Sequence, residues 1–470
     1  MTLRISCLFL ILLLSIVVSA QKIGSKLERV WIKFIADDQL QYGLAGICVM
    51  DAKTGNIIFE KNSNIGLAPA STQKILTTIA AYEALGSNFT YKTKIGYTGN
   101  IINKKLNGDL IIEASGDPTL GSWRYSTTSE DVILNKINDA IKQAGIEGIE
   151  GNMVATDKGF DINPIPDNWM WGDMGNYYGA GHWGLNWREN QYDIYFKSGR
   201  IQGDSTSVVK VEPEESIVGK LIYNEVKTGD ANTGDGSSIY TAPFSPIKLI
   251  QGNISSNQKR FQIAGSFSLA DMNCLVAIQS ALQKKGVAIS GKLMPVSAKL
   301  FTPEKLPLSG QVSNILIIAS PSLDSIVYWF LKKSVNLYGE ALVRTIGLEK
   351  KNYGSTDKGL EWVDSFYTAN GFNTKAMHMT DGSGLAPTNR ITALALVKAL
   401  QYAQNKTWFP AFYDALPVYN AMKLKSGTIH RTKCFAGYHN GFIISFMVNN
   451  YNGSGSSLVN KMYKVLDVLK

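Results

Sequence analysis

The chain has 470 residues, of which 45% are hydrophobic and 18% are charged. This is the composition of a globular protein, and it excludes an intrinsically disordered chain. At about 100–200 residues per domain, the length predicts two or three domains. The formal net charge is +9. Its basic residues are dispersed, however, and no run of them predicts a nucleic-acid partner.

The first twenty residues have the pattern of a secretory signal peptide. Arg4 supplies a short positive start, residues 7–18 are almost wholly apolar, and Ser19 and Ala20 are small. The apolar stretch is shorter than the about 18–20 residues that a membrane-spanning helix needs. We therefore expect residues 1–20 to be removed by cleavage after Ala20, which leaves a mature chain with no membrane span.

The mature chain would keep three cysteines, an odd number at wide spacings, and this predicts no disulfide framework. The four histidines are scattered and form no H-E-x-x-H or paired motif, which argues against a zinc peptidase. These residues are Cys48, Cys274 and Cys434, and His182, His378, His430 and His439.

The predicted elements change in character along the chain. Residues 46–60 predict a β-hairpin, and a helix follows that opens at residues 69–71 and ends at Gly86. The stretch from about residue 90 to 300 is rich in Gly, Asn and Thr and predicts a mostly β region. Later helices are expected over residues 322–331, 337–348 and 457–469, and later strands over 421–429, 435–438 and 442–450.

One glycine motif has the wrong surroundings for its best-known use. Gly179-Ala180-Gly181-His182-Trp183-Gly184 satisfies the G-x-G-x-x-G pattern. Dinucleotide binding needs a buried strand before such a motif and a helix after it, whereas here aromatic residues surround it. We interpret the segment as a glycine-rich loop packed on aromatic side chains.

Three short motifs carry the chemistry. Ser71-Thr72-Gln73-Lys74 is S-x-x-K, Ser334-Val335-Asn336 is S-x-N, and Lys425-Ser426-Gly427-Thr428 is K-[ST]-G followed by Thr. Each pattern also occurs elsewhere in the chain. Only these copies open a helix after a hairpin, join two helices, and begin an antiparallel β unit. In this order they resemble the active-site set of penicillin-binding proteins and serine β-lactamases.

The first spacing has a direct physical meaning. Residues i and i+3 of a helix share a face, so Ser71 Oγ and Lys74 Nζ can meet within hydrogen-bond range. A serine hydroxyl needs a neighbouring base to take its proton. Lysine serves as that base only when its amine is partly neutral, and burial or a nearby cation such as Lys425 favours the neutral form.

The resemblance implies a role for each remaining residue. Backbone N–H groups of Ser71 and Thr428 would stabilise the oxyanion. Ser334 would relay a proton to the leaving amine, and Asn336 would hold a substrate amide. In the third motif, Lys425, Ser426 and Thr428 would receive a terminal carboxylate. Lys425 would also be a catalytic residue, with Ser71, Lys74 and Ser334, and Gly427 would belong to the substrate-binding residues.

Further segments narrow the resemblance to one family. They are Gly116-Asp117-Pro118-Thr119-Leu120, residues 333–341 and Asp381-Gly382-Ser383-Gly384-Leu385. With the three motifs, they resemble the class C low-molecular-mass penicillin-binding proteins, the D-alanyl-D-alanine carboxypeptidase/endopeptidases of the penicillin-binding protein 4 type. The implied fold is an α/β (α+β) transpeptidase domain, in which helices flank an antiparallel sheet. Residues 21–89 and 305–470 would form this domain, and residues 90–304 would be inserted β-rich subdomains.

The resemblance also implies a substrate and a location. The substrate would be the peptide of peptidoglycan, cut through an acyl-enzyme on Ser71, and β-lactams would acylate the same serine. The protein would be located in the periplasm, and no metal or organic cofactor is implied.

The motifs depart from the family pattern in three ways. Ser426 stands where Thr is usual, Val335 stands where Asp is frequent, and Ala386-Pro387 stands where many members carry a basic residue. Arg390 is a candidate to hold an acidic substrate side chain instead.

Two alternatives stay open at this point. One is a serine β-lactamase, although the chain shows no Glu-plus-Asn loop of class A enzymes and carries a large insertion. The other is a non-catalytic periplasmic binding or sensor protein on the same fold.

Overall fold

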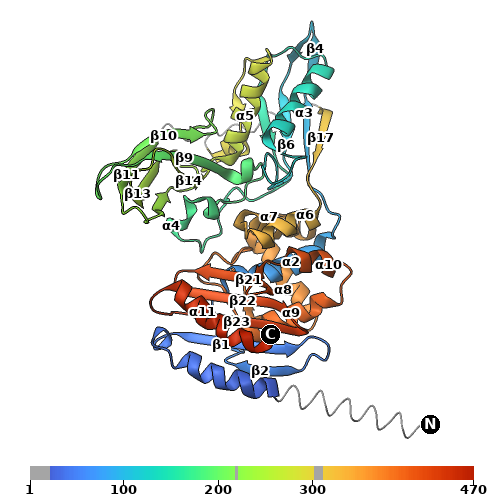
Figure 1. The fold of residues 1–470 in the computed structure, drawn as a ribbon. Helices are drawn as coiled ribbons and strands as arrows, with labels where there is room; N and C mark the ends of the chain where they lie inside the picture. The colour runs from blue at the N-terminus through green and yellow to red at the C-terminus, as the bar shows by residue number, and fades with distance from the viewer. Residues whose placement is uncertain (1–21, 218–220, 301–310) are drawn as a thin grey trace, which may run out of the picture. The chain divides into compact units, whose positions relative to one another are not determined.

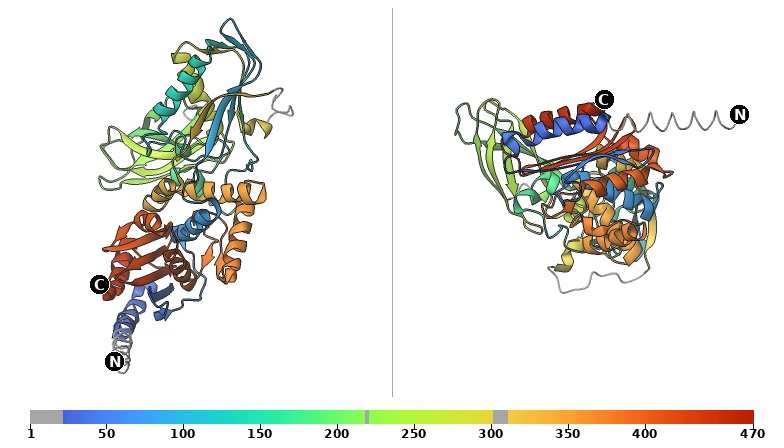
Figure 2. Two further views of the ribbon diagram at one scale, coloured as in Figure 1. Left: turned by 90° about the vertical axis from the view of Figure 1, so that its right-hand side faces the viewer. Right: turned by 90° about the horizontal axis from the view of Figure 1, so that it is seen from below.

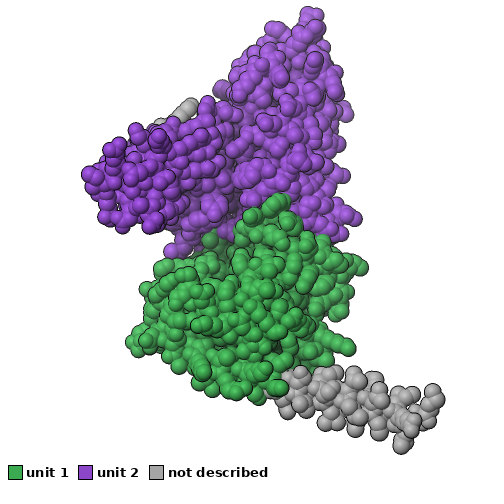
Figure 3. Space-filling model, viewed as in Figure 1, with its two compact units in different colours: residues 1–83, 327–334, 363–470 green, residues 84–326, 335–362 purple. Residues whose placement is uncertain are grey.

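The computed structural model describes residues 22–217, 221–300 and 311–470. The expected signal peptide, residues 1–20, lies outside the described residues. Two compact units are distinguished, as Figure 3 shows: unit 1 holds residues up to 83, 327–334 and 363–470, and unit 2 holds 84–326 and 335–362. The domain division expected at residues 89 and 305 stays a prediction. Within the described part of the chain, no helix has the length and apolar composition of a membrane span.

Unit 1 is built on one antiparallel sheet of six strands, ordered β2-β1-β23-β22-β21-β20 (Figure 1). The central pairing joins the two ends of the chain, because Leu44 of β1 lies opposite Asn449 of β23. The strands are β1 (Leu44–Asp51), β2 (Ile57–Lys61), β20 (Val418–Tyr419), β21 (Met422–Ile429), β22 (Thr432–His439) and β23 (Phe442–Asn449).

Helices cover both faces of this sheet. On one face, a helix over residues 22–35 lies beside α11 (Gly455–Leu466), as the view from below in Figure 2 shows. Its buried side chains Leu27, Trp31 and Phe34 share a hydrophobic cluster with Leu458 and Met462 of α11. On the other face lie the short 3-10 helix η2 (Ala70–Gln73) and α9 (Ala393–Gln404). The helix α2 (Lys74–Leu85) continues directly from η2.

The helices around the second motif begin and end close to the expected places. They are α6 (Leu323–Lys332) and α7 (Asn336–Lys351), and α8 (Thr356–Ala369) and α10 (Phe409–Ala415) come later in the chain. The break between α6 and α7 is short because Ser334 takes a left-handed backbone conformation, with φ of 58°.

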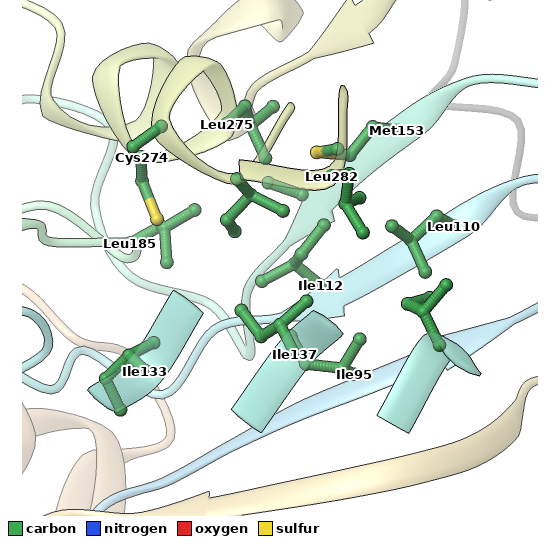
Figure 4. Packing of buried hydrophobic residues seen from close by; sticks show 14 of the residues in the cluster. Ile95, Leu110, Ile112, Ile133, Ile137, Met153, Leu185, Cys274, Leu275 and Leu282 are labelled. Carbon is green, nitrogen blue, oxygen red and sulfur yellow. The ribbon is translucent and has the colours of Figure 1, made fainter. Parts of the chain in front are cut away.

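In unit 2, a mixed five-stranded sheet packs against two helices. The strand order is β16-β8-β6-β3-β17, and Figure 4 shows Ile133 and Ile137 of α3 among the same buried side chains as Leu275 of α5. The expectation of a mostly β middle region missed these helices. The elements are α3 (Glu130–Gln143), α5 (Ala270–Lys284), β3 (Lys92–Tyr97), β6 (Leu110–Glu113), β8 (Met153–Thr156), β16 (Leu293–Met294) and β17 (Ser313–Ala319).

Three smaller sheets complete the described strands of unit 2. Their orders are β15-β7-β5-β4, β10-β9-β14 and β11-β13-β12. A second hydrophobic cluster, which includes Trp183, Phe196 and Ile250, fills the space between the last two sheets. The bounds are β4 (Asn100–Ile102), β5 (Lys105–Asn107), β7 (Gly148–Ile149), β9 (Gln191–Lys197), β10 (Ser207–Glu212), β11 (Ile222–Thr228), β12 (Asp235–Tyr240), β13 (Lys248–Ile254), β14 (Phe261–Ser266) and β15 (Ala288–Ile289).

The glycine motif at residues 179–184 lies in a loop with no βαβ frame. It packs on aromatic side chains: His182 contacts the ring of Phe160, and Trp183 contacts that of Phe244. The structure therefore agrees with the interpretation as an aromatic loop.

The chain just after this loop makes an unusual buried turn. Arg188, Glu189 and Asn190 all have positive φ, between 53° and 54°. The turn presents the Glu189 carboxylate, 4% exposed, to three donors inside unit 2. Ser122 Oγ donates at 2.7 Å, Arg124 Nε at 2.8 Å and the Tyr338 hydroxyl at 2.6 Å.

Candidate active site

Ser71 and Lys74 meet as their spacing predicts. Lys74 Nζ lies 2.9 Å from Ser71 Oγ. The pair spans η2, and in a 3-10 helix residues i and i+3 stand directly above one another. The Lys74 side chain is fully buried and Ser71 is half-buried. A buried amine is thus held beside a hydroxyl that solvent can still reach.

A loop far along the chain fixes the other side of Lys74. Lys74 Nζ donates to the Ser383 carbonyl at 2.6 Å, and the side chain of Gln73 donates to Asp381 at two oxygens, 2.7 and 2.9 Å away. Thr77 Oγ1 donates to the Gly382 carbonyl at 2.6 Å. The sequence marked residues 381–385 only by family likeness and gave them no place in the site.

The buried carboxylate of Asp381 holds this loop in shape. Its oxygens accept the backbone N–H groups of Gly384 at 2.8 Å and Ala386 at 2.7 Å, and the Asn389 amide at 2.9 Å. Gly384 is left-handed, with φ of 81°, and a Cβ there would lie 2.0 Å from the Ala70 carbonyl oxygen. Glycine is therefore required where the loop meets η2.

The third motif lies on β21, directly against η2. A Cβ at Gly427 would lie 2.6 Å from the Pro69 carbonyl oxygen and 3.0 Å from the Ser71 nitrogen. The backbone around Gly427 is thus beside the N–H of Ser71, one of the two donors that the motifs predict for the oxyanion.

Lys425 is 2% exposed and its Nζ donates to the Ser426 carbonyl at 2.9 Å. Burial lowers the pKa of Lys425 to about 7. Ser426 is half-buried and Thr428 is exposed. The Thr428 hydroxyl accepts a hydrogen bond from Lys433 Nζ of β22 at 3.1 Å, and no sequence motif indicates this bond.

The second motif spans the boundary between the two units, with Ser334 in unit 1 and Asn336 in unit 2. Ser334 follows α6, whose Phe330 ring lies under Lys74 Nζ, 5.6 Å from the ring centroid. Asn336 begins α7 in unit 2, is 8% exposed, and donates from its side-chain amide to the Tyr178 carbonyl at 2.8 Å. The structure thus joins the first motif to Gly427 and to the end of α6.

Arg390 does not stand free for a substrate in this structure. Its Nη1 donates to the carbonyl oxygens of Pro387 at 2.6 Å and Asn389 at 2.7 Å, while the side chain remains exposed. Its role in holding an acidic side chain, and the roles assigned above to Ser334, Asn336 and the third motif, stay predictions.

Comparison with protein families settles the family of the chain. The model of the D-Ala-D-Ala carboxypeptidase 3 (S13) family matches residues 31–440. The chain belongs to this family. It is a serine-type peptidase of the S13 group, as the sequence motifs predicted.

Individual relatives agree with the S13 assignment. A D-alanyl-D-alanine carboxypeptidase from Actinomadura sp. (strain R39) is 25% identical over 390 residues, which cover 82% of this chain and 69% of the relative. The D-alanyl-D-alanine carboxypeptidase DacB of Haemophilus influenzae is 24% identical over 369 residues, covering 76% and 70%.

The fold of this S13 protein also matches a solved structure. Penicillin binding protein 4 from Haemophilus influenzae superposes with a TM-score of 0.77 at 20% identity, over 91% of this chain and 96% of that chain. The predicted α+β transpeptidase fold is confirmed.

Proposed function

We propose that this S13 protein hydrolyses the D-alanyl-D-alanine end of peptidoglycan stem peptides through an acyl-enzyme on Ser71, as a carboxypeptidase that can also cut peptide cross-links. The observation that carries the proposal is the 2.9 Å contact between Lys74 Nζ and Ser71 Oγ, made by a fully buried lysine. A serine hydroxyl needs a neighbouring group that can take its proton, and Lys74 is placed for that role.

Acylation follows from this geometry in balanced steps. Neutral Lys74 takes the proton of Ser71 Oγ as the oxygen attacks the carbonyl carbon of the penultimate D-Ala. The oxyanion is stabilised by the backbone N–H groups of Ser71 and Thr428. The C–N bond then breaks, and the leaving amine takes a proton that Ser334 relays. Free D-Ala departs and Ser71 carries an ester.

Deacylation repeats the same chemistry with water. A water molecule gives a proton to Lys74 and attacks the ester carbonyl, and Ser71 leaves with its proton restored. Asn336 holds a substrate amide, while Lys425, Ser426, Gly427 and Thr428 receive the terminal carboxylate. β-Lactams would acylate Ser71 as substrate mimics.

The same proposal includes where the enzyme works. The pattern of residues 1–20 supports export across the inner membrane with cleavage after Ala20 and a periplasmic address, where peptidoglycan lies. The N-terminal sequence of the protein purified from cells tests this point, and a chain that still begins at Met1 would contradict it.

The test of the chemistry is the intact mass of the mature protein after incubation with benzylpenicillin. We expect one lasting adduct on the wild type and none on Ser71→Ala. Ser207→Ala is the matched control, because Ser207-Val208-Val209-Lys210 has the same S-x-x-K spacing but lies on the strand β10. D-Ala release from a pentapeptide should follow the same pattern.

Two results would replace the proposal by an alternative. Drug hydrolysis without a lasting adduct would favour a serine β-lactamase. An absence of adduct, drug hydrolysis and D-Ala release would favour a binding or sensor protein.

A further inference from the structure

The helix over residues 22–35 has two different sides. Leu27, Trp31 and Phe34 are buried against the sheet of unit 1. The side that faces away from the sheet carries a basic stripe, because positions i, i+4, i+7 and i+11 of an α-helix fall on one line along its surface. The residues of the basic stripe are Lys22, Lys26, Arg29 and Lys33, and all of them are exposed.

The charge of the basic stripe is not neutralised by neighbouring acids. Among the described residues, no carboxylate forms an ion pair with its last three cations. Glu28 is the one acid of the helix, and it pairs with Lys61 at 3.0 Å. Asp37, just beyond the helix, pairs with Lys461 of α11 at 2.6 Å. The sequence of α11 contains no acid and adds the exposed Lys464, so this surface has an excess of positive charge.

Two exposed isoleucines lie next to the basic stripe. Ile32 is 55% exposed and Ile35 is 47% exposed. Ile32 is three residues from both Arg29 and Ile35, so these side chains are neighbours on the helix surface. Cations beside large apolar side chains match the interface of a lipid bilayer, where anionic head groups lie above an apolar interior. A polyanion in solution would pair with the cations but leave the isoleucines in water.

This surface is on the opposite face of the sheet from the nucleophile. The helix over residues 22–35 and α11 cover one face, as Figure 2 shows, whereas η2, which carries Ser71, lies on the other. An anion at the basic stripe is therefore separated from Ser71 by the sheet. Contact with a bilayer through this surface would leave the face that carries Ser71 open to substrate.

We propose that the basic stripe, with Ile32 and Ile35, is a docking surface for a bilayer that contains anionic lipids. The cations contact the lipid phosphates, and the two isoleucines insert between the head groups. The protein then rests on the membrane without spanning it, and the η2 face of the sheet is turned away from the lipid. This surface goes beyond the proposed function and does not depend on it.

The experiment measures how the mature chain sediments with lipid vesicles. One set of vesicles is pure phosphatidylcholine, and the other also contains the anionic lipid phosphatidylglycerol. Two variants are compared with wild type. The stripe variant combines Lys26→Gln, Arg29→Gln and Lys33→Gln, and the apolar variant combines Ile32→Gln and Ile35→Gln.

A matched control removes the same amount of charge from other parts of unit 1. It combines Lys53→Gln, Lys375→Gln and Lys398→Gln, all at exposed positions. Lys398 lies on α9, which covers the same face of the sheet as η2. Equal Tm values for wild type and all variants show that a change in sedimentation does not come from unfolding.

Wild type should bind the anionic vesicles and not the neutral ones, and high salt should release it because salt screens exposed charges. The stripe variant should lose about 100-fold in partition coefficient, at about fivefold for each cation removed. The apolar variant should lose about tenfold, because its side chains no longer gain from leaving water. The control variant should lose less than about fivefold.

The outcomes that overturn the proposal are distinct from those that overturn the proposed function. Wild type that sediments equally with the two kinds of vesicle would overturn it, and so would a stripe variant that binds as well as the control. An apolar variant that binds like wild type would show that the stripe accepts any polyanion, and the assignment to a bilayer would be wrong. Peptide hydrolysis that survives Ser71→Ala would overturn the proposed function and leave this docking surface unaffected.

Discussion

Gly427 and Ser71 approach each other so closely that a Cβ on the glycine would lie 3.0 Å from the serine's backbone nitrogen. The same Cβ would meet the Pro69 carbonyl oxygen at 2.6 Å. Both neighbours are backbone atoms, which cannot rotate away as the end of a side chain can. The glycine of the third motif is therefore what lets β21 lie beside the N–H of the nucleophile.

Gly427→Ala should separate β21 from η2 and weaken the oxyanion site. We expect the rate of acylation by benzylpenicillin to fall by about 100-fold, the usual effect of moving a catalytic donor by about 1 Å. Gly66→Ala is the control, because its Cβ would meet only the Arg390 Cβ at an ordinary 3.4 Å. Equal acylation rates for Gly427→Ala and wild type would contradict this reading of the contact.

Asp381→Ala should loosen the loop that supplies the Ser383 carbonyl to Lys74. The change leaves the N–H groups of Gly384 and Ala386 without their buried acceptor. We expect a loss of about 2–4 kcal/mol in the free energy of unfolding, measured in urea, and slower acylation of the remaining folded protein. Thr380→Ala is a milder comparison nearby, because its hydroxyl partners lie at a part-exposed site. A Tm equal to that of wild type would refute the role given to Asp381.

Lys425→Met should change stability in a pH-dependent way. Burial lowers the pKa of Lys425 from 10.5 to about 7, so between these values the unfolded chain binds a proton that the folded chain does not. The free energy of unfolding of the wild type therefore rises with pH across this window, and the cost of burial is fully present below about pH 7.

At pH 6, we expect Lys425→Met to be more stable than wild type, by an amount on the order of 5 kcal/mol. The difference should shrink steadily towards pH 10. Urea unfolding at pH 6 and pH 9 measures this, with Lys464→Met as the charge control. A gain that does not depend on pH would show that packing, not protonation, is responsible.

Glu189→Ala should destabilise unit 2. The substitution leaves Arg124 and the Tyr338 hydroxyl without the buried carboxylate that accepts their hydrogen bonds. We expect a loss of about 3 kcal/mol, seen as a lower Tm by calorimetry. Glu147→Ala is the comparison, because its ion pair with Lys104 is exposed and its removal should leave Tm unchanged. Similar Tm values for the two variants would contradict the importance of the buried network.

The local part of the site could be predicted from the sequence. The i, i+3 spacing of Ser71 and Lys74 places both on one turn, and their side chains meet at 2.9 Å. The break between two helices at Ser334 and the strand that begins near Lys425 follow from apolar periodicity, which is a property of short segments.

The contacts between distant parts of the chain at the site could not be predicted from the sequence. The Ser383 carbonyl that contacts Lys74 is a backbone group, and any residue type would supply one. The bond from Gln73 to Asp381 joins residues more than 300 positions apart, and nothing in the pattern near Gln73 points to it. The helix α3, in contrast, could have been predicted from the sequence, because Ile133, Ile137 and Ile141 recur at helical spacing. The prediction of a mostly β region rested on the Gly, Asn and Thr content of the whole stretch, and so it overlooked this short periodic segment.

The pairing of β1 with β23 has a consequence for how the protein is made. Leu44 near the start of the chain lies opposite Asn449 near its end, and β21 reaches β1 only through β22 and β23. The ribosome must therefore finish almost the whole polypeptide before the strand that carries Lys425 can join the hairpin that precedes Ser71. Pairing strands that lie so far apart in the chain gives the fold many long-range contacts, and such contacts slow folding.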